Sequence, residues 1–448
     1  MSIVVVLVVP KLIGVKEYGY WQLYLFYSTY VGFLHFGWND GIYLRYGGEE
    51  YRNLDKKLFF SQFHLLLIFQ ILIALIISVL SVIYIKDADR LFIFLMVAIC
   101  LVITNVRWML IYILQATNRI KEYAQITIIG RVLYVSIILT LLAAGFRDYK
   151  LMIVADIIGR FISLSYAIIR CRDMVFRKLS SFYFSIEETL RNISAGIKLM
   201  FATIASMLII GVVRFGIESS WDVATFGKVS LTLSASNFMM LFINAIGVVI
   251  FPVLKRTNTS NLSAIYLTMR DFLMLVLLGL LIVYYPLKVV LSFWLPKYSD
   301  SLTYMALLFP ISVYEGKMAL LINTYLKTLR KEALMLKINM ISLSVSLITT
   351  FLLSKIFVDL NVLIVSIVFL LGFRCILAEI LLSRILGISL IKDIILEFTL
   401  TVLFIVTGWY INSWNTILMY SLGYVIYLLI KSNNIKTSVI SLKRLTKA

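Results

Sequence analysis

The chain has 448 residues, of which 61% are hydrophobic and 15% are charged, and its net charge is +19. Soluble domains contain roughly 45–50% apolar residues, so this composition excludes an ordinary soluble protein. Apolar runs of about 20 residues indicate a polytopic α-helical membrane protein instead. Most cations lie between these runs. This position indicates that the positive charge sets the membrane topology and contacts anionic headgroups, rather than binding nucleic acid.

The apolar runs predict fourteen segments, each helical because a helix satisfies its own backbone hydrogen bonds in lipid. In chain order the segments cover residues 2–13, 18–44, 58–85, 91–116, 123–145, 150–170, 196–216, 223–251, 268–294, 301–326, 333–357, 359–384, 391–411 and 414–430. The first is too short to span a bilayer, and we interpret it as the end of a helix whose start is missing. The expected fold is therefore all-α, with about 13–14 transmembrane helices.

The loops between the segments alternate between a set rich in Lys and Arg and a set with few cations. The basic set includes Arg119, Lys121, Arg270 and a tail that begins at Lys431. By the positive-inside rule this set, and with it the C-terminus, is cytoplasmic. The longest basic loop lies near the middle of the chain and mixes charged with aromatic residues at helical spacing, which predicts an amphipathic helix on the membrane surface.

This loop divides the chain into two halves, and the expected architecture is two six-helix lobes plus two extra C-terminal helices. The predicted boundaries are an N-terminal lobe at 1–170, an amphipathic linker at 171–195, a C-terminal lobe at 196–385, two additional helices at 386–430 and a basic cytoplasmic tail at 431–448.

A short motif occurs once in each half, in "GVKEYGYWQL" and again in "DVATFGKVSL". Both copies follow the first helix of their half and open the second. Parallel halves with such equivalent positions are a known transporter architecture. We predict that Gly19 and Gly227, the glycines of the motif, allow close packing at a tight outer turn.

Six cations fall within the apolar runs, where a charge costs about 2.5–3.5 kcal/mol on insertion scales and should therefore face a bundle interior or a wet cavity. They are Arg107, Arg131, Arg160, Arg214, Lys317 and Arg374. We predict a cationic cavity that binds an anionic substrate, since the planar guanidinium grips phosphate oxygens. Pairing across helices, or snorkelling to the interface, is the alternative, above all for Arg160 and Arg214.

Acidic residues are fewer in these runs. Asp156 and Arg160 are four residues apart and should pair on one helix face. Asp156, Glu315 and Glu379 are the candidate residues for coupling transport to a proton or a sodium ion.

Enzyme chemistry has little support in the sequence. There is no Walker A loop, the three cysteines are far apart, and His35 and His64 are the only histidines, so we expect no metal site, no cofactor and no catalytic residue. Asp87 and Asp89 in "KDADR" leave a membrane glycosyltransferase open as an alternative, although the outer loops are short for an acceptor site.

Several stretches carry a family resemblance: "GVKEYGYWQLYLF", "GWNDGIYLRYGG", "ILQATNRIKEYAQ", "FGKVSLTLSASNFMMLFINAIGVVIFPVLKR" and "INTYLKTLRKE". In these the chain resembles the bacterial polysaccharide repeat-unit flippases, of the multidrug/oligosaccharidyl-lipid/polysaccharide exporter superfamily. The resemblance covers nearly the whole chain.

It implies two lobes, alternating access in the bacterial cytoplasmic membrane, and a polyprenyl-diphosphate-linked oligosaccharide as cargo. Membrane lipids, a polysaccharide polymerase and assembly proteins are the partners that it implies. A multidrug or small-molecule exporter of the same superfamily is the main alternative, and it should have an acidic cavity. A non-transporting scaffold remains a further one.

Overall fold

The computed structural model describes residues 3–240, 243, 262–411 and 415–434. The described residues are overwhelmingly helical, and ten of their helices are long and apolar enough to cross a membrane. The chain is therefore an all-α polytopic membrane protein, as predicted. The end of the predicted segment 223–251 and most of the basic tail lie outside the described residues.

The helices group into two compact units. The N-terminal unit comprises Met1–Ile204 and Val223–Gly227, and the C-terminal unit comprises Ala205–Asp222 and Lys228–Ala448. The boundary at residue 204 falls inside one long helix, α9 (Ile186–Ser220), so this helix belongs to both units. The residues predicted as two additional helices, 386–430, are part of the C-terminal unit.

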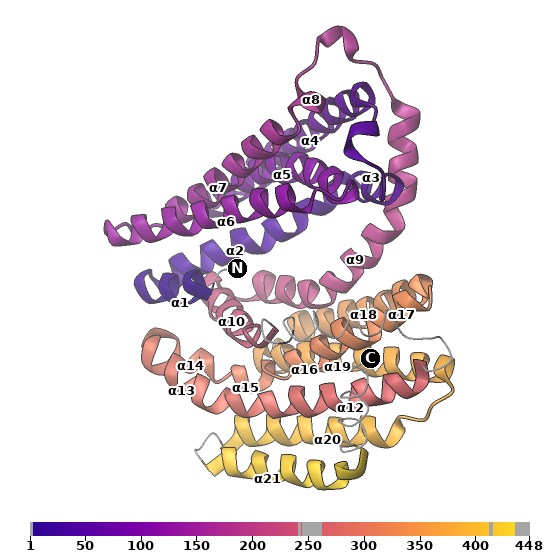
Figure 1. Ribbon diagram of the computed structural model, residues 1–448. Coiled ribbons are helices and arrows are strands. Elements are labelled where there is room, and N and C mark those ends of the chain that lie inside the picture. Colours follow the sequence, from indigo (N-terminus) through magenta and orange to yellow (C-terminus); the bar gives the residue numbers. More distant parts are fainter. Residues whose placement is uncertain (1–2, 241–242, 244–261, 412–414, 435–448) are drawn as a thin grey trace. The chain divides into compact units, whose positions relative to one another are not determined.

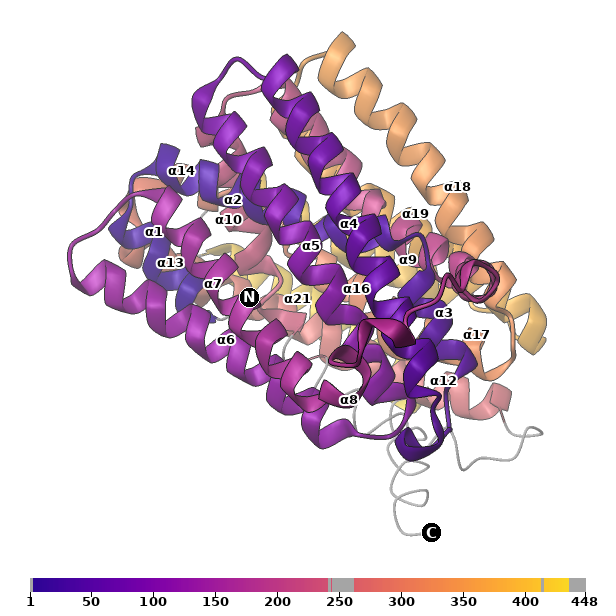
Figure 2. The same ribbon diagram turned by 90° about the horizontal axis from the view of Figure 1, so that it is seen from above.

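The principal helices of the N-terminal unit are α1 (Ile3–Leu12), α2 (Val15–Tyr30), α3 (Trp38–Arg45), α4 (Lys56–Tyr84), α5 (Ala88–Ala116), α6 (Ile120–Ala143), α7 (Tyr149–Arg170) and α8 (Arg172–Val175). Helices α4 and α5 lie side by side, as do α6 and α7 (Figures 1 and 2). Helix α5 also packs against α7 and α2, and its Met109, Leu110 and Leu114 are fully buried in the core of the unit.

Aspartate side chains fix where several long helices begin. Asp55 accepts hydrogen bonds from the backbone N–H of Lys57 at 2.8 Å and starts α4, and Asp87 accepts one from Arg90 at 2.7 Å and starts α5. Asp148 caps α7 in the same way. Each cap satisfies N–H groups that have no partner inside the helix.

The predicted segment 18–44 is broken into two helices. Helix α2 ends at Tyr30, a 3-10 turn η1 (Val31–His35) follows, and Phe36 and Gly37 take the left-handed φ angles of 53° and 84° before α3 begins. A Cβ atom on Gly37 would lie 2.6 Å from the backbone N of Ile197, so the backbones of α3 and α9 are in direct contact here. The glycine is required by its φ angle and by this contact together.

The two glycines of the repeated motif meet each other. A Cβ on Gly19, in α2, would lie 2.2 Å from the carbonyl oxygen of Val223, and a Cβ on Gly227 would lie 2.7 Å from the Cα of Gly19. Val223 and Gly227 belong to the first turns of α10 (Val223–Ser236). The expectation of close packing is confirmed, but both glycines lie inside helices rather than at a turn.

The principal helices of the C-terminal unit are α12 (Leu262–Leu280), α13 (Tyr284–Trp294), α14 (Ser299–Leu302), α15 (Met305–Leu308), α16 (Ile311–Lys317), α17 (Asn323–Thr328), α18 (Glu332–Phe351), α19 (Leu360–Leu386), α20 (Ile391–Val406) and α21 (Asn415–Ile430). A π-helical turn, η7 (Met318–Ile322), separates α16 from α17 directly after Lys317. Such turns often occur at functional positions.

Candidate functional site: a cationic cavity in the N-terminal unit

A cavity of about 270 Å³ opens between α5, α6 and α7. Its lining residues are Arg107, Trp108 and Ile111 from α5, Tyr123, Thr127, Gly130, Arg131 and Tyr134 from α6, and Asp156 and Arg160 from α7. Three of the six cations predicted from the sequence therefore line one cavity, together with one of the three acids.

Asp156 and Arg160 neutralise each other within this cavity. The Nε of Arg160 lies 2.6 Å from Oδ2 of Asp156, one helical turn away, which confirms the predicted pair. The hydroxyl of Tyr24, in α2, donates to the same carboxylate oxygen at 2.7 Å, and Nη1 of Arg160 donates to Thr104 at 3.2 Å. The extra hydrogen bonds from Tyr24 and to Thr104 help to compensate the burial of this ion pair.

Arg107 and Arg131 have no such compensation. Arg107 donates from Nη1 to the hydroxyl of Ser163 at 3.1 Å, but its Nε is buried and finds no partner among the described residues. Arg131 is an exposed residue at the cavity and pairs with no carboxylate in the described part of the chain. Together with the neutral pair, these two guanidinium groups give the cavity a formal charge of +2.

Small residues bring the charged positions of α6 and α7 together. A Cβ on Gly130 would lie 2.8 Å from the Cβ of Ser163, and one on Gly159 would lie 3.0 Å from the carbonyl oxygen of Gly130. Close approach of two membrane helices at small residues is a common packing mode. Arg131 follows Gly130, and Arg160 follows Gly159, so this crossing places both arginines at the cavity.

Aromatic side chains form the rest of the wall. Trp108 lies beside Arg107 on α5, and Tyr123 and Tyr134 lie on α6. The hydroxyl of Tyr134 is buried and makes no hydrogen bond to any described residue. An unpaired buried hydroxyl costs free energy, and a bound ligand with a hydroxyl or phosphate oxygen is one way to satisfy it.

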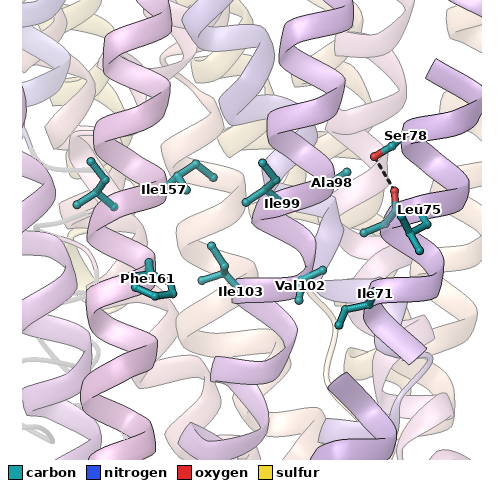
Figure 3. Close-up of a pocket in the computed structure, with 11 residues that line it drawn as sticks. Ile71, Leu75, Ser78, Ala98, Ile99, Val102, Ile103, Ile157 and Phe161 are labelled. Atoms are coloured by element: carbon teal, nitrogen blue, oxygen red, sulfur yellow. Dashed lines mark hydrogen bonds between the residues drawn. The ribbon is translucent and has the colours of Figure 1, made fainter. Parts of the chain in front are cut away.

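A second hollow in the same unit is apolar. It measures about 610 Å³ and lies between α4, α5 and α7, with Leu75, Ile103 and Phe161 among its walls (Figure 3). Its one hydroxyl, on Ser78, is already bonded to the carbonyl oxygen of Ala74 at 2.8 Å (Figure 3). This hollow suits hydrocarbon and offers nothing to an anionic group.

In the C-terminal unit, Lys317 belongs to a network of buried charges that join α12, α16, α19 and α20 to the residue after α21. Its members are Arg270, Asp271, Lys317, Glu379, Asp393, Glu397 and Lys431. With three basic and four acidic groups, the network has a formal charge of −1.

The centre of the network is a four-membered cluster. Arg270 is fully buried and lies 2.7 Å from Glu379 and 2.6 Å from Glu397. Lys317, which is 3% exposed, lies 2.7 Å from Glu397 and also pairs with Glu379. Lys317 is thus held by two carboxylates, and Glu379 by two cations.

The remaining predicted residues are also placed in the C-terminal unit. Arg374 is buried and lies 3.0 Å from Glu315, while its other nitrogens donate to Asn339 and Ser206. Arg214 donates to the hydroxyl of Ser230 at 3.0 Å. Lys317 and Arg374 are therefore paired with acids on other helices, which is the alternative to a cavity role that the sequence analysis considered.

Sequence reasoning missed several members of the network. Arg270 was assigned to a cytoplasmic loop, but α12 begins at Leu262 and encloses it, so that assignment is wrong. Lys431, assigned to the basic tail, is 4% exposed and pairs with Asp271 and Asp393. The adjacent Arg270 and Asp271 at the edge of an apolar run were the available signal.

The acids that motivated a glycosyltransferase have other roles in the structure. Asp87 caps α5, and Asp89 accepts a hydrogen bond from Tyr149 at 2.7 Å and lies 3.5 Å from Lys150. Within the described residues, no three His, Cys, Asp or Glu side chains gather as a metal site would require.

Comparison with known proteins identifies the fold. No protein-family model and no curated protein matches the chain. Among solved structures, the chain is similar to the inward-facing conformation of a multidrug resistance transporter of the MATE family, in the MOP superfamily. The TM-score is 0.59 at 12% identity, and the match covers 86% of this chain and 95% of that one. The chain therefore shares the fold of that transporter.

Proposed function

We propose that the chain is a flippase that moves a polyprenyl-diphosphate-linked oligosaccharide from the inner to the outer leaflet of the bacterial cytoplasmic membrane. One observation carries the proposal: the cavity of the N-terminal unit has two guanidinium groups, on Arg107 and Arg131, without a carboxylate partner in the described chain. Uncompensated charge at membrane depth is expensive and is usually functional. The transporter fold supports transport as the activity.

The charge of the cavity fits a diphosphate. Two planar guanidinium groups offer paired N–H donors to phosphate oxygens, and a cargo with two negative charges balances the +2 of the site. The walls formed by Trp108, Tyr123 and Tyr134 offer aromatic faces and one free hydroxyl to a sugar ring. The prenyl chain needs no polar site and remains in hydrocarbon throughout the cycle.

Transport by alternating access requires the protein to bind the cargo on one side, change conformation and release it on the other. Net transport also needs a source of free energy, for which we propose proton or sodium coupling through Asp156, Glu315 or Glu379. Each is paired with a cation. Protonation of the carboxyl would release that cation. The polysaccharide polymerase and the assembly proteins stay proposed partners, and the basic loops favour a cytoplasmic C-terminus.

The second candidate is a drug exporter, favoured by the similarity to a multidrug resistance transporter. A cavity that binds cationic drugs needs uncompensated acids. In the cavity described above the single acid, Asp156, is already paired with Arg160. The charge of this cavity therefore favours the anionic cargo.

The test uses a strain that lacks the protein and carries Arg107→Gln/Arg131→Gln in its place. We expect lipid-linked oligosaccharide to accumulate on the inner leaflet and surface polysaccharide to fall. Lys121→Gln is the matched control, because Lys121 is an exposed cation on the same helix as Arg131 and does not line the cavity. Arg107→Lys keeps the positive charge but loses the planar guanidinium group, and it should retain partial activity. Normal surface polysaccharide with increased drug sensitivity would instead establish the exporter.

A further inference from the structure

The chain between α7 and α9 carries large apolar side chains that no other part of the described chain covers. Phe176 is 70% exposed, Leu179 is 83% exposed and Phe184 is 75% exposed. All three lie outside the ten helices that are long enough to span a membrane. In Figure 1 this stretch forms the loop beyond α8. The stretch contains α8 and a 3-10 turn, η3 (Leu179–Ser181), and the rest of the predicted linker, residues 186–195, forms the first turns of α9.

Both ends of the loop are held firmly to the N-terminal unit. At its start, Cys171 is fully buried and the hydroxyl of Tyr51 donates to Asp173 at 2.7 Å. At its end, Gln62 of α4 donates to the hydroxyl of Ser185 at 2.6 Å, and the N–H of Tyr183 donates to Ser61. The exposed position of the apolar side chains is therefore built into the fold.

The loop also carries cations without carboxylate partners. Arg172, Arg177 and Lys178 are exposed, and none of them pairs with an acid among the described residues. Arg177 donates only to the backbone carbonyl of Asp173, at 3.3 Å.

The acids near the loop are already paired with other cations. Asp173 lies 3.6 Å from Lys56, and Glu188 lies 2.6 Å from Arg45. The loop itself has a net charge of +2, and because Lys56 of α4 pairs with its one acid, Asp173, three cations remain beside the exposed aromatic rings.

We propose that this surface, defined by Arg172, Phe176, Arg177, Lys178, Leu179 and Phe184, binds anionic phospholipids. The cations contact the headgroups, and the three apolar side chains enter the boundary between headgroups and acyl chains. Basic and aromatic side chains side by side are the composition that membrane interfaces select. The loop follows the end of one spanning helix and precedes the start of another, so the membrane surface lies within its reach.

The position of the loop gives the contact a consequence. Helix α9 begins at Ile186, two residues after Phe184, and it runs through residues of both units. Lipid contact at the loop therefore fixes the start of the helix that joins them. This inference does not depend on which cargo the protein carries.

The test places an environment-sensitive fluorophore on Phe184→Cys in the full-length protein. The three native cysteines are buried, so the introduced thiol is the reactive one. The protein is reconstituted in vesicles of phosphatidylcholine alone or of an equal mixture with phosphatidylglycerol. Quenching by iodide reports contact with water, and quenching by brominated lipid reports insertion. A fluorophore on Leu179→Cys repeats the measurement without changing Phe184.

We expect lipid quenching to increase with phosphatidylglycerol and the increase to be lost in Arg172→Gln/Arg177→Gln/Lys178→Gln. Each cation near an anionic surface shifts the binding equilibrium about fivefold, so three shift it about a hundredfold. A fluorophore on Glu50→Cys, in a polar loop of the same unit, should stay accessible to iodide in both vesicles. Equal insertion in both vesicle types, or protection that appears only when soluble cell proteins are added, would overturn the proposal.

Discussion

Replacing Lys317 by Met distinguishes a structural role for this buried cation from a role in binding cargo. Its side chain is 3% exposed, and the ammonium group lies between Glu379 and Glu397. The variant leaves four acids and two cations in the network. Removal of one partner from a buried ion pair typically costs about 3–5 kcal/mol, because the remaining charge stays buried without compensation.

For a domain of about 150–250 residues, 1 kcal/mol lowers Tm by about 2–4 °C, so the expected decrease is about 6–20 °C. Thermal unfolding of purified protein in detergent measures it. The double variant Lys317→Met/Glu379→Gln removes one charge of each sign and should recover at least half of the loss. Lys337→Met, at an exposed cation of the same unit, should change stability by no more than about 0.5 kcal/mol.

The structural reasoning fails if Lys317→Met unfolds like the wild type and yet abolishes transport. That result would mean that the ammonium group contacts the cargo, as the sequence suggested. An equal loss in the single and double variants would also contradict the pairing, since the double variant restores the charge balance.

Three further predictions concern the N-terminal unit. Gly19→Ala should destabilise the protein by about 1–3 kcal/mol in a thermal unfolding assay, because the new Cβ would lie 2.2 Å from the carbonyl oxygen of Val223. Gly32→Ala is the control, since a Cβ at that position meets nothing within 4 Å. Tyr24→Phe should cost about 1.5–3 kcal/mol in the same assay, since it removes a hydrogen bond to the charged Asp156, and an unchanged Tm would refute that bond. Burial raises the pKa of the Cys171 thiol to about 12, so the thiol is protonated at pH 8. It should resist maleimide in the folded protein and become reactive only as the pH nears 12 or on unfolding. Detection of the maleimide adduct by mass spectrometry in folded protein at pH 8 would contradict this.

The positions of the helices were predictable from the sequence because lipid allows few alternatives. The apolar run 58–85 became α4 and the run 359–384 became α19, each within a few residues. In hydrocarbon every backbone polar group must be satisfied internally, so an apolar run of this length has one favoured structure. The break at Gly37 was not predicted, since it depends on contact with α9, which is distant in the sequence.

The charges were predictable only where their partners are local. Asp156 and Arg160 are four residues apart on one helix, and their pair was expected and is found. Lys317 and Glu379 are 62 residues apart, and Arg270 and Glu379 are 109 apart. Pairs of this kind are set by how helices pack, and the order of residues along the chain carries no signal for them.

The central claim is that Arg107 and Arg131 bind an anion in the cavity between α5, α6 and α7. Its most direct measurement is the binding of a short-chain prenyl diphosphate sugar to purified protein, beside the uncharged prenyl glycoside of the same sugar. Loss of hydrogen bonds to charged groups costs about 1.5–3 kcal/mol each, so Arg107→Gln/Arg131→Gln should weaken binding of the diphosphate at least a hundredfold and leave the uncharged analogue unchanged. Equal affinity of the wild type for the charged and the uncharged ligand would contradict the account.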